Sequence, residues 1–196
     1  MRFGVAILGA GASSRMGRPK LLLPWGENTI LAHLIQQWTE LGAAQIAVVI
    51  EAKSPLVAHV EDVDSIVNPQ PVSGMFSSVQ CASRWNGWKP EVTHFVIALG
   101  DQPHVGIETL KIIINFASQN PQNVCQLSRN GRPRHPVILP KSCFLELANA
   151  KEPNLKEFLR ARESQRRLLE SADASLDVDI DTPEDYEKAL QYTSRR

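Results

Sequence analysis

The chain has 196 residues, which is enough for one full α/β core, and we expect a single domain over residues 1–196. Its 21 Lys and Arg residues balance its 21 Asp and Glu residues, which argues against a nucleic-acid-binding footprint and against a polybasic membrane patch. Three cysteines, Cys81, Cys125 and Cys143, lie far apart without the spacing of zinc ligands, so we expect neither structural zinc nor a disulfide framework. The composition therefore favours small-molecule partners.

Three short apolar runs, residues 3–8, 46–50 and 95–99, do not alternate with polar residues and predict strands that are buried on both faces. The apolar start, residues 3–12, could also be the core of a signal peptide. However, only Arg2 precedes it and a Gly-rich segment with cations follows, so a strand explains more of these residues. No apolar run is long enough to span a bilayer, and we expect a cytoplasmic protein that contacts no membrane.

Between and after these strands, residues 30–41, 75–85 and 107–117 have apolar side chains at helical spacing and predict helices. The first helix has Asn28 as a candidate N-cap and ends before Gly42, whereas Ser73 lies near the start of the second. Strands that alternate with helices in this way predict a parallel sheet.

The second half of the chain departs from that pattern. Two short runs within residues 124–139 flank Arg129-Asn130-Gly131, which predicts an antiparallel hairpin. Residues 144–150 and 155–162 fit short helices, and residues 176–180 alternate as a strand that leads to a final helix capped by Thr182. We therefore predict a doubly wound, Rossmann-like α/β domain whose sheet is mostly parallel, with a small antiparallel excursion.

The loop after the first strand reads LGAGASSRMGRPKLLLPWG from Leu8 onwards. Two glycines let backbone N–H groups approach a ligand closely, and three cations, Arg15, Arg18 and Lys20, follow them. Backbone donors combined with cations suit a polyphosphate.

Other functions of this loop have to be weighed. A Walker A loop requires Gly-Lys-Ser/Thr, but Lys20 follows a proline and precedes a leucine. The dinucleotide fingerprint matches Gly9 and Gly11, yet Ser14 replaces its third glycine and Glu51 lies about twice the expected distance along the chain. An NAD-dependent oxidoreductase is therefore weakly supported, and a solvated basic surface loop is a further alternative.

The run L-G-A-G-x-S-S-R-M-G-R-P-K-L-L-L-P resembles the signature of the MobA-like nucleotidyltransferases, most of all the molybdenum cofactor cytidylyltransferases. The resemblance implies the nucleotide-diphospho-sugar transferase type of fold. It also implies nucleotide binding by Leu8, Gly9, Ala10, Gly11, Arg15 and Lys20. The family usually opens with Leu-Ala-Ala-Gly, so Gly9 replaces an alanine. Guanylyltransferase relatives carry Leu-Ala-Gly-Gly, and Ala10 therefore favours CTP over GTP.

Acidic residues at two places could hold a metal ion. Asp101 follows an apolar strand, where open α/β sheets place ligands, although an Asp there can also cap the next helix. If residues 176–180 form a strand that continues to Asp181, Asp179 and Asp181 point to the same side and could converge on one cation. The resemblance implies Mg²⁺ as cofactor, held by Asp101 and by one acid of the later segment, Asp181 before Asp179.

Two further segments resemble family elements. Asn68-Pro69 and the later Gly-Met-x-Ser-Ser resemble a segment between nucleotide and acceptor, which makes Asn68 and Ser77 candidate nucleotide contacts. A loop followed by a capped helix explains the same residues equally well. Arg134-His135-Pro136-Val137 resembles a Gly-His-Pro-Val element, so Arg134 and His135 become candidate acceptor contacts, with Arg134 in place of the usual glycine.

The resemblance implies an enzyme that transfers a nucleoside monophosphate to the terminal phosphate of molybdenum-molybdopterin. In such a reaction Lys20 and Arg15 stabilise charge while Asp101 holds the metal ion, and no protein nucleophile is required. The alternatives are GTP in place of CTP, another phosphorylated acceptor such as a sugar phosphate, and a non-catalytic accessory protein that hands the cofactor to a client molybdoenzyme.

Overall fold

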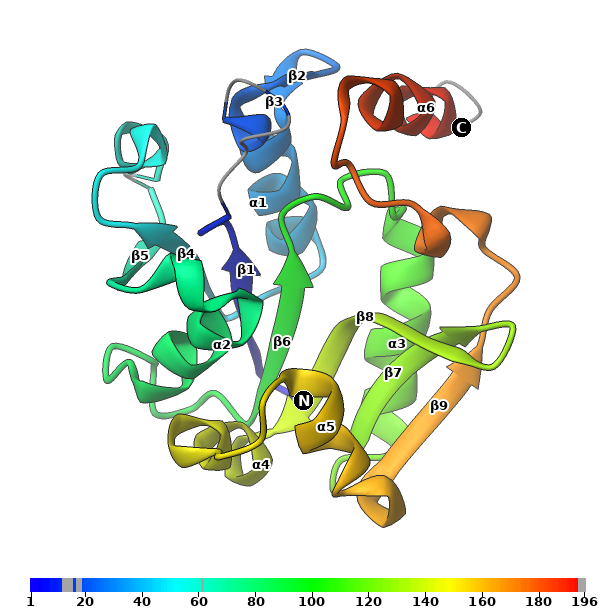
Figure 1. Ribbon diagram of the computed structural model, residues 1–196. Coiled ribbons are helices and arrows are strands. Elements are labelled where there is room, and N and C mark those ends of the chain that lie inside the picture. Colours follow the sequence, from blue (N-terminus) through cyan, green and yellow to red (C-terminus); the bar gives the residue numbers. More distant parts are fainter. Residues whose placement is uncertain (12–15, 17–18, 61, 194–196) are drawn as a thin grey trace.

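The computed structural model describes residues 1–11, 16, 19–60 and 62–193, which form a seven-stranded sheet with helices on both faces (Figure 1). In the order of the sheet, the strands are β5 (Asp64–Asn68), β4 (Gln45–Glu51), β1 (Phe3–Leu8), β6 (His94–Leu99), β8 (Arg132–Pro140), β7 (Val124–Arg129) and β9 (Arg166–Glu170). Among the strands that the structure describes, β8 alone runs antiparallel to its neighbours in this sheet. The predicted fold, mostly parallel with an antiparallel excursion, is confirmed.

Side chains of the central strands alternate between two buried cores. Val5 and Ile7 face one core and Ala6 faces the other. The helices over the first core are α1 (Ile30–Glu40) and α3 (Ile107–Gln119), and those over the second are α2 (Met75–Arg84), α4 (Lys141–Glu146) and α5 (Leu155–Arg160). Because both faces are covered, the inner positions of these strands are apolar on both sides, which is why their sequences lack alternation. Within the described part of the chain, no helix has the length and apolar character needed to cross a bilayer.

The start of α1 differs from the prediction, and the start of α2 has no side-chain cap. Thr29, not Asn28, caps α1, because its hydroxyl accepts a hydrogen bond from the backbone N–H of Ala32. Asn28 instead pairs with Trp25 in a two-stranded ribbon formed by β2 (Pro24–Trp25) and β3 (Asn28–Thr29). Helix α2 follows Gly74, whose φ of 88° lies in the left-handed region, and no side chain caps it, so Ser73 is not its cap.

The hairpin of β7 and β8 is confirmed. Its two turn residues, Asn130 and Gly131, have φ values of 51° and 70°, which only residues tolerant of the left-handed region adopt easily. The turn places the start of β8 beside the chain segment that follows β9, because Arg134 of β8 donates from Nε to Asp177 Oδ1 at 2.8 Å. This end of the sheet therefore contacts the segment that carries the last acidic residues.

The strand predicted for residues 176–180 is wrong. This part of the chain forms a 3-10 turn at Ala174–Asp177 and then runs without a sheet partner to α6 (Pro183–Thr193). Its backbone bonds are local or reach another loop: Val178 N–H donates to Ser175, and Ile180 N–H donates to the carbonyl of Asp101 at 3.2 Å. The last strand is instead β9, whose sequence RRLLE has no alternation and whose side chains are half-buried or exposed.

The final helix begins as predicted. The hydroxyl of Thr182 accepts from the N–H of Asp185, and the carboxylate of Asp185 accepts from the N–H of Thr182, which is a reciprocal cap with Pro183 in the first turn. Helix α6 contributes Ala189 to the core under α1 and α3, and the hydroxyl of Tyr186 donates to the carbonyl of Pro24 at 2.5 Å. It lies at the carboxyl-end edge of the central strands, at the top of Figure 1.

Candidate active site

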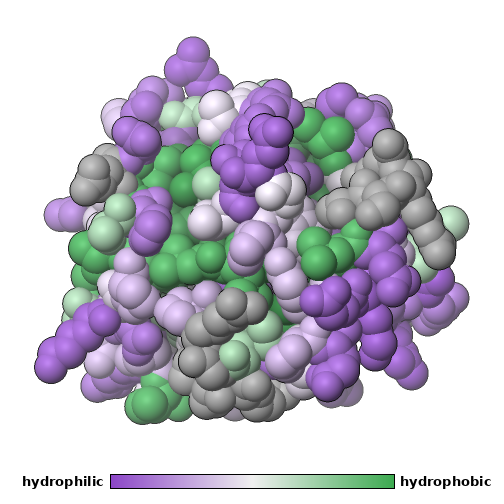
Figure 2. All heavy atoms as spheres, turned by 90° about the horizontal axis from the view of Figure 1, so that it is seen from above, coloured by the Kyte–Doolittle hydropathy of each residue, from purple (hydrophilic) through white to green (hydrophobic). Residues whose placement is uncertain are grey.

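A cleft of about 700 Å³ opens at the carboxyl ends of β4, β1 and β6. Figure 2 views this side of the molecule from above, where apolar surface lies between hydrophilic borders. One part of the wall consists of residues 8–11 and of residues near the ends of β4 and β5, and the other part carries Lys20, Asp101, Asp179 and Asp181. Parallel α/β sheets bind ligands at this edge, because the loops that follow neighbouring strands meet there.

Two glycines allow the loops around the cleft to pack closely. The N–H of Gly9 donates to the carbonyl of Val49 at 2.8 Å, and a Cβ at Gly9 would lie 2.9 Å from the side chain of Leu21. A Cβ at Gly100 would lie 2.8 Å from the backbone oxygen of Leu8, a distance so short that the backbone would have to shift. Among the residues that the structure describes, a Cβ at Gly11 would meet nothing within 4 Å. Gly9 and Gly100 thus serve packing, whereas Gly11 lines the cleft.

Lys20 joins three segments that lie far apart in the sequence. Its Nζ donates to Asp101 Oδ2 at 2.9 Å, to the carbonyl of Ile180 at 2.9 Å and to Asp181 Oδ1 at 3.4 Å. The side chains are largely sheltered, with exposed fractions of 17% for Lys20, 24% for Asp101 and 42% for Asp181. The cluster brings two carboxylates to one place in the cleft, and carboxylate oxygens are ligands that divalent cations such as Mg²⁺ prefer.

The carboxylates are chemically suited to a divalent cation. Asp101 Oδ1 is buried and has no hydrogen-bond partner among the described residues, although an unsatisfied buried carboxylate oxygen is costly. The protein ligands are few, since the described residues contain no group of three or more His, Cys, Asp or Glu side chains that could hold a metal ion. Such a site fits Mg²⁺ or Mn²⁺, which are commonly held by one or two carboxylates while substrate phosphates and water complete the coordination.

A matching family model covers residues 5–171 and describes the MobA-like NTP transferase domain. The chain belongs to the MobA-like NTP transferase family. It is a nucleotidyltransferase, and this membership agrees with the loop of residues 8–20, the Asp101 strand end and the mostly parallel sheet.

Two known proteins illustrate the relationship. The chain is 29% identical over 184 residues to the molybdenum cofactor cytidylyltransferase of Escherichia coli (strain K12), a match that covers 92% of this chain and 91% of that protein. Rv0371c from Mycobacterium tuberculosis H37Rv superposes with a TM-score of 0.80 and 25% identity over 97% of this chain and 98% of that chain. A second structure of Rv0371c, in complex with manganese, superposes with a TM-score of 0.71 and 22% identity over 97% and 99% of the two chains.

The two later acids line the same cleft, but by another route than predicted. Asp179 and Asp181 lie in the loop before α6 and not on a strand, so period-two alternation does not place them. Asp181 contacts Lys20, whereas Asp179 Oδ1 accepts a hydrogen bond from Gln102 Nε2 at 2.8 Å. Of these two acids, Asp181 is thus the one drawn into the cluster with Asp101.

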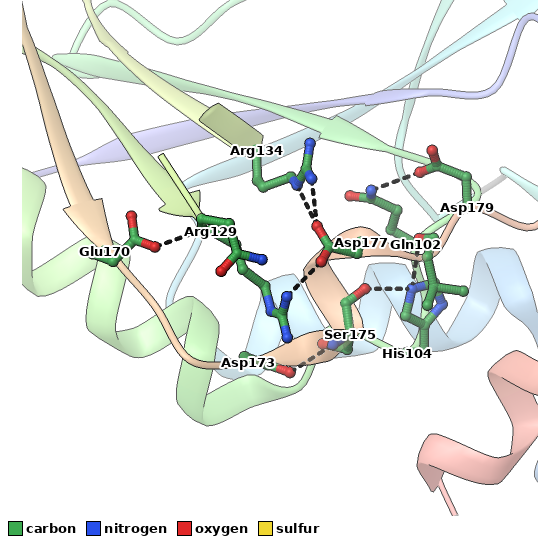
Figure 3. Close-up of polar contacts among 11 residues, drawn as sticks. Gln102, His104, Arg129, Arg134, Glu170, Asp173, Ser175, Asp177 and Asp179 are labelled. Carbon is green, nitrogen blue, oxygen red and sulfur yellow. Dashed lines mark hydrogen bonds and ion pairs between the residues drawn. The ribbon is translucent and has the colours of Figure 1, made fainter. Parts of the chain in front are cut away.

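A polar network holds this loop in place (Figure 3). His104 Nε2 lies 3.1 Å from the carbonyl of Ser175 and 2.9 Å from that of Val178, and the imidazole is buried. Burial lowers the pKa of His104 more than these hydrogen bonds raise it, which favours a neutral ring that donates from Nε2. His104 carries no signal in the sequence that could have revealed this role, because a single His three residues after Asp101 matches no motif spacing.

Asp177 anchors the same loop to the β7–β8 hairpin. Arg129 donates to Asp177 Oδ2 at 2.6 Å, and Arg134 donates from Nε to Asp177 Oδ1 at 2.8 Å (Figure 3). The hydrogen bond from Arg134 is the main reason that the pKa of Asp177 is lowered. Neither Arg134 nor His135 lines the cleft. His135 Nδ1 lies 3.4 Å from the carbonyl of Ile97, and burial lowers its pKa despite the nearby charge of Asp101.

Asn68 and Ser77 form an internal network. The Asn68 side chain is buried, donates to the hydroxyls of Ser77 at 2.8 Å and Ser78 at 2.9 Å, and accepts from the N–H of Gln70 at 2.9 Å. The hydroxyl of Ser77 also donates to the carbonyl of Gly74 at 2.7 Å. These contacts connect β5 to α2, and the cleft is lined by Ser78 rather than by Ser77.

Arg15 was predicted to neutralise the triphosphate together with Lys20. It lies outside the described residues, as do Ser14 and Arg18. Of the other predicted nucleotide contacts, Leu8, Gly9, Ala10, Gly11 and Lys20 line the cleft, whereas Asn68 and Ser77 do not.

Proposed function

We propose that the protein transfers CMP from CTP to the terminal phosphate of molybdenum-molybdopterin. The observation that carries this proposal is the convergence of Lys20, Asp101 and Asp181 at one end of a cleft that also contains the Leu8–Gly11 backbone. An acceptor phosphate oxygen would bond to the α-phosphorus while the bond from that phosphorus to the bridging oxygen breaks and pyrophosphate leaves. Such transfer depends on positioning and on neutralised charge.

The residues divide into three groups of roles. The backbone of residues 8–11 would cradle the nucleotide, and Lys20 with Arg15 would balance the charge of its phosphates. Asp101 and Asp181 would hold Mg²⁺, with Asp179 as the alternative second ligand. A divalent cation at this place supplies electrostatic stabilisation of the phosphate oxygens. The manganese complex of Rv0371c supports a metal-binding role of this fold but not the choice of magnesium.

Lys20 can serve two purposes. Its ammonium holds the two carboxylates together, which pre-forms the metal site, and it lies in the cleft wall where phosphate oxygens would reach it. Because these groups are sheltered, their interactions with phosphate are stronger than they would be in bulk water. Asn68 and Ser77 would act by positioning α2, since their polar atoms already bond within the protein.

The acceptor would approach from the β7–β8 side, where His135 and Arg134 lie. His135 does not line the cleft, but its Nδ1 lies 3.4 Å from the carbonyl of Ile97 in β6, the strand that leads to Asp101. Arg134 would act through Asp177, which it pairs with. The preference for CTP rests on Ala10, at the position where guanylyltransferase relatives carry glycine, and on the 29% identity to the E. coli cytidylyltransferase.

Pyrophosphate release tests the proposal. The full chain is incubated with molybdenum-loaded molybdopterin, Mg²⁺ and each of the four nucleoside triphosphates in turn, and we expect release with CTP above all others. Release with GTP above CTP would overturn the choice of base. Release only with a sugar phosphate as acceptor would overturn the choice of molybdenum-molybdopterin. Tight cofactor binding without turnover would indicate an accessory protein that delivers the cofactor to a client molybdoenzyme.

A further inference from the structure

Glu51 is a second acidic feature of the cleft that the proposed chemistry does not use. It is the last residue of β4, it is half-buried, and it lines the cleft with residues 8–11. Its carboxylate forms no hydrogen bond or ion pair with any residue that the structure describes. A sheltered carboxylate without a protein partner is a candidate for pairing with a ligand.

The position of Glu51 argues against phosphate as that ligand. Strands β4 and β6 lie on opposite sides of β1, so Glu51 and Asp101 begin roughly 10 Å apart, two strand spacings, across the loop of residues 8–11. A carboxylate repels phosphate, and among the described residues Lys20 and the candidate metal ligands Asp101 and Asp181 lie on the other side of that loop. If the triphosphate lies at Lys20 and Asp101, the uncharged nucleoside extends toward Glu51.

The surroundings of Glu51 suit a flat ring. The wall beyond β4 and before α2 presents Pro55, Leu56, Pro71 and Met75 to the cleft. Apolar walls with one polar group are the usual composition of a small-molecule pocket, in which the polar group fixes orientation and specificity. The polar group here is an acceptor only, because an ionised carboxylate has no proton to donate.

We propose that Glu51 accepts a hydrogen bond from the exocyclic amino group of the nucleotide base and thereby selects cytosine over uracil. This inference rests on the proposed function for its ligand, a nucleoside triphosphate. Cytosine carries an amino group where uracil carries a carbonyl oxygen, and a carboxylate that faces that oxygen places two acceptors together. A site with such a partner rejects the analogue that lacks the donor.

The test measures binding without an acceptor, which separates it from the test of turnover. Calorimetric dissociation constants for CTP and UTP with Mg²⁺ are compared for the wild type, Glu51→Gln, Glu51→Ala and the control Glu187→Gln, an exposed α6 residue outside the cleft. We expect the wild type and the control to prefer CTP by about 10- to 100-fold, because hydrogen bonds to charged groups are strong. In Glu51→Gln the carboxamide can donate to the uracil oxygen, so the ratio should fall toward one as UTP binding improves.

An unchanged ratio of CTP to UTP affinity in both Glu51 variants would overturn the inference. Equal weakening of CTP and UTP would also overturn it, since that result indicates a ribose contact, which 2′-deoxy-CTP would identify. Tighter binding of GTP than of CTP by the wild type would likewise overturn it, because cytosine is the inferred partner of Glu51. Thermal unfolding of each variant checks the fold. A Glu51-dependent ratio without pyrophosphate release would refute the transferase proposal alone.

Discussion

Lys20 Nζ lies 2.9 Å from Asp101 Oδ2, although the two residues are 81 positions apart in the chain. The contact connects the loop after β1 to the loop after β6, and the carbonyl of Ile180 adds a third segment to the same ammonium. One side chain thus holds together the parts of the cleft that we assign to phosphate and metal binding.

Replacement of Lys20 by Ala should reduce kcat/KM for pyrophosphate release by about 100- to 1,000-fold, the usual loss when a preorganised charge-stabilising donor is removed. Two carboxylates would then face each other without their shared cation. Lys111→Ala is the matched control, because Lys111 is exposed on α3 and pairs only with Glu108 among the described residues. Near-normal turnover of Lys20→Ala would contradict its assigned role.

The metal ligands can be separated by manganese binding, followed by electron paramagnetic resonance in the presence of nucleotide. Asp101→Asn and Asp181→Asn should each weaken Mn²⁺ binding by at least about tenfold, because both remove a carboxylate charge beside Lys20. Asp179→Asn should bind Mn²⁺ nearly as the wild type does, since its oxygen can still accept from Gln102. Weak binding by Asp179→Asn with normal binding by Asp181→Asn would reverse the assignment.

The role of Arg134 can be tested by a double-mutant cycle. If Arg134 positions the loop of residues 171–181 through Asp177, Arg134→Ala should raise the KM for the acceptor in the wild type but change nothing further in Asp177→Asn. A direct contact with the acceptor predicts an additional loss in the double variant. Thermal unfolding of all four proteins shows whether the fold is kept, and the KM for CTP serves as the internal control.

Buried histidines should make the fold sensitive to mild acid. Burial lowers the pKa of His94, which contacts the carbonyl of Pro121, and also lowers the pKa of His33, His104 and His135. Below the unfolded-state value of about 6.5, the unfolded chain binds protons that the native chain excludes. The free energy of unfolding should therefore be constant near pH 8 and fall as the pH drops below about 6.5.

Urea titrations at a series of pH values measure this dependence. His94→Gln should show a shallower fall between about pH 6.5 and the lower native pKa, because one of the groups no longer titrates. His59→Gln is the control, since His59 is exposed. Identical slopes for His94→Gln and the wild type would show that His94 does not contribute.

Several features could be predicted from local sequence because local physics decides them. The apolar runs that become β1, β4 and β6 show no alternation, since both faces of the sheet are covered. The turn at Asn130 and Gly131 requires left-handed backbone, and the cap of α6 depends on neighbours within three residues of Thr182. For the same reason Asp101 could be placed at a strand end and in the cleft.

Other features failed because competing contacts decide them. Residues 176–180 alternate like a strand, but the carbonyls of Ser175 and Val178 bond to His104, and the N–H of Ile180 bonds to Asp101. Strand β9 has no alternating pattern in its sequence, and it forms because its backbone pairs with the edge of β7. Asn68 looked like a ligand contact, yet its amide bonds inside the protein.

Local sequence was enough to predict the doubly wound sheet and the family, because apolar periodicity, turn residues and the motif from Leu8 to Lys20 are local properties. The contacts inside the cleft needed the folded chain: Asp181 rather than Asp179 contacts Lys20 beside Asp101, and Glu51 lines the same cleft. These contacts join residues that lie far apart in the sequence. They depend on the order of the strands in the sheet, which no local pattern specifies.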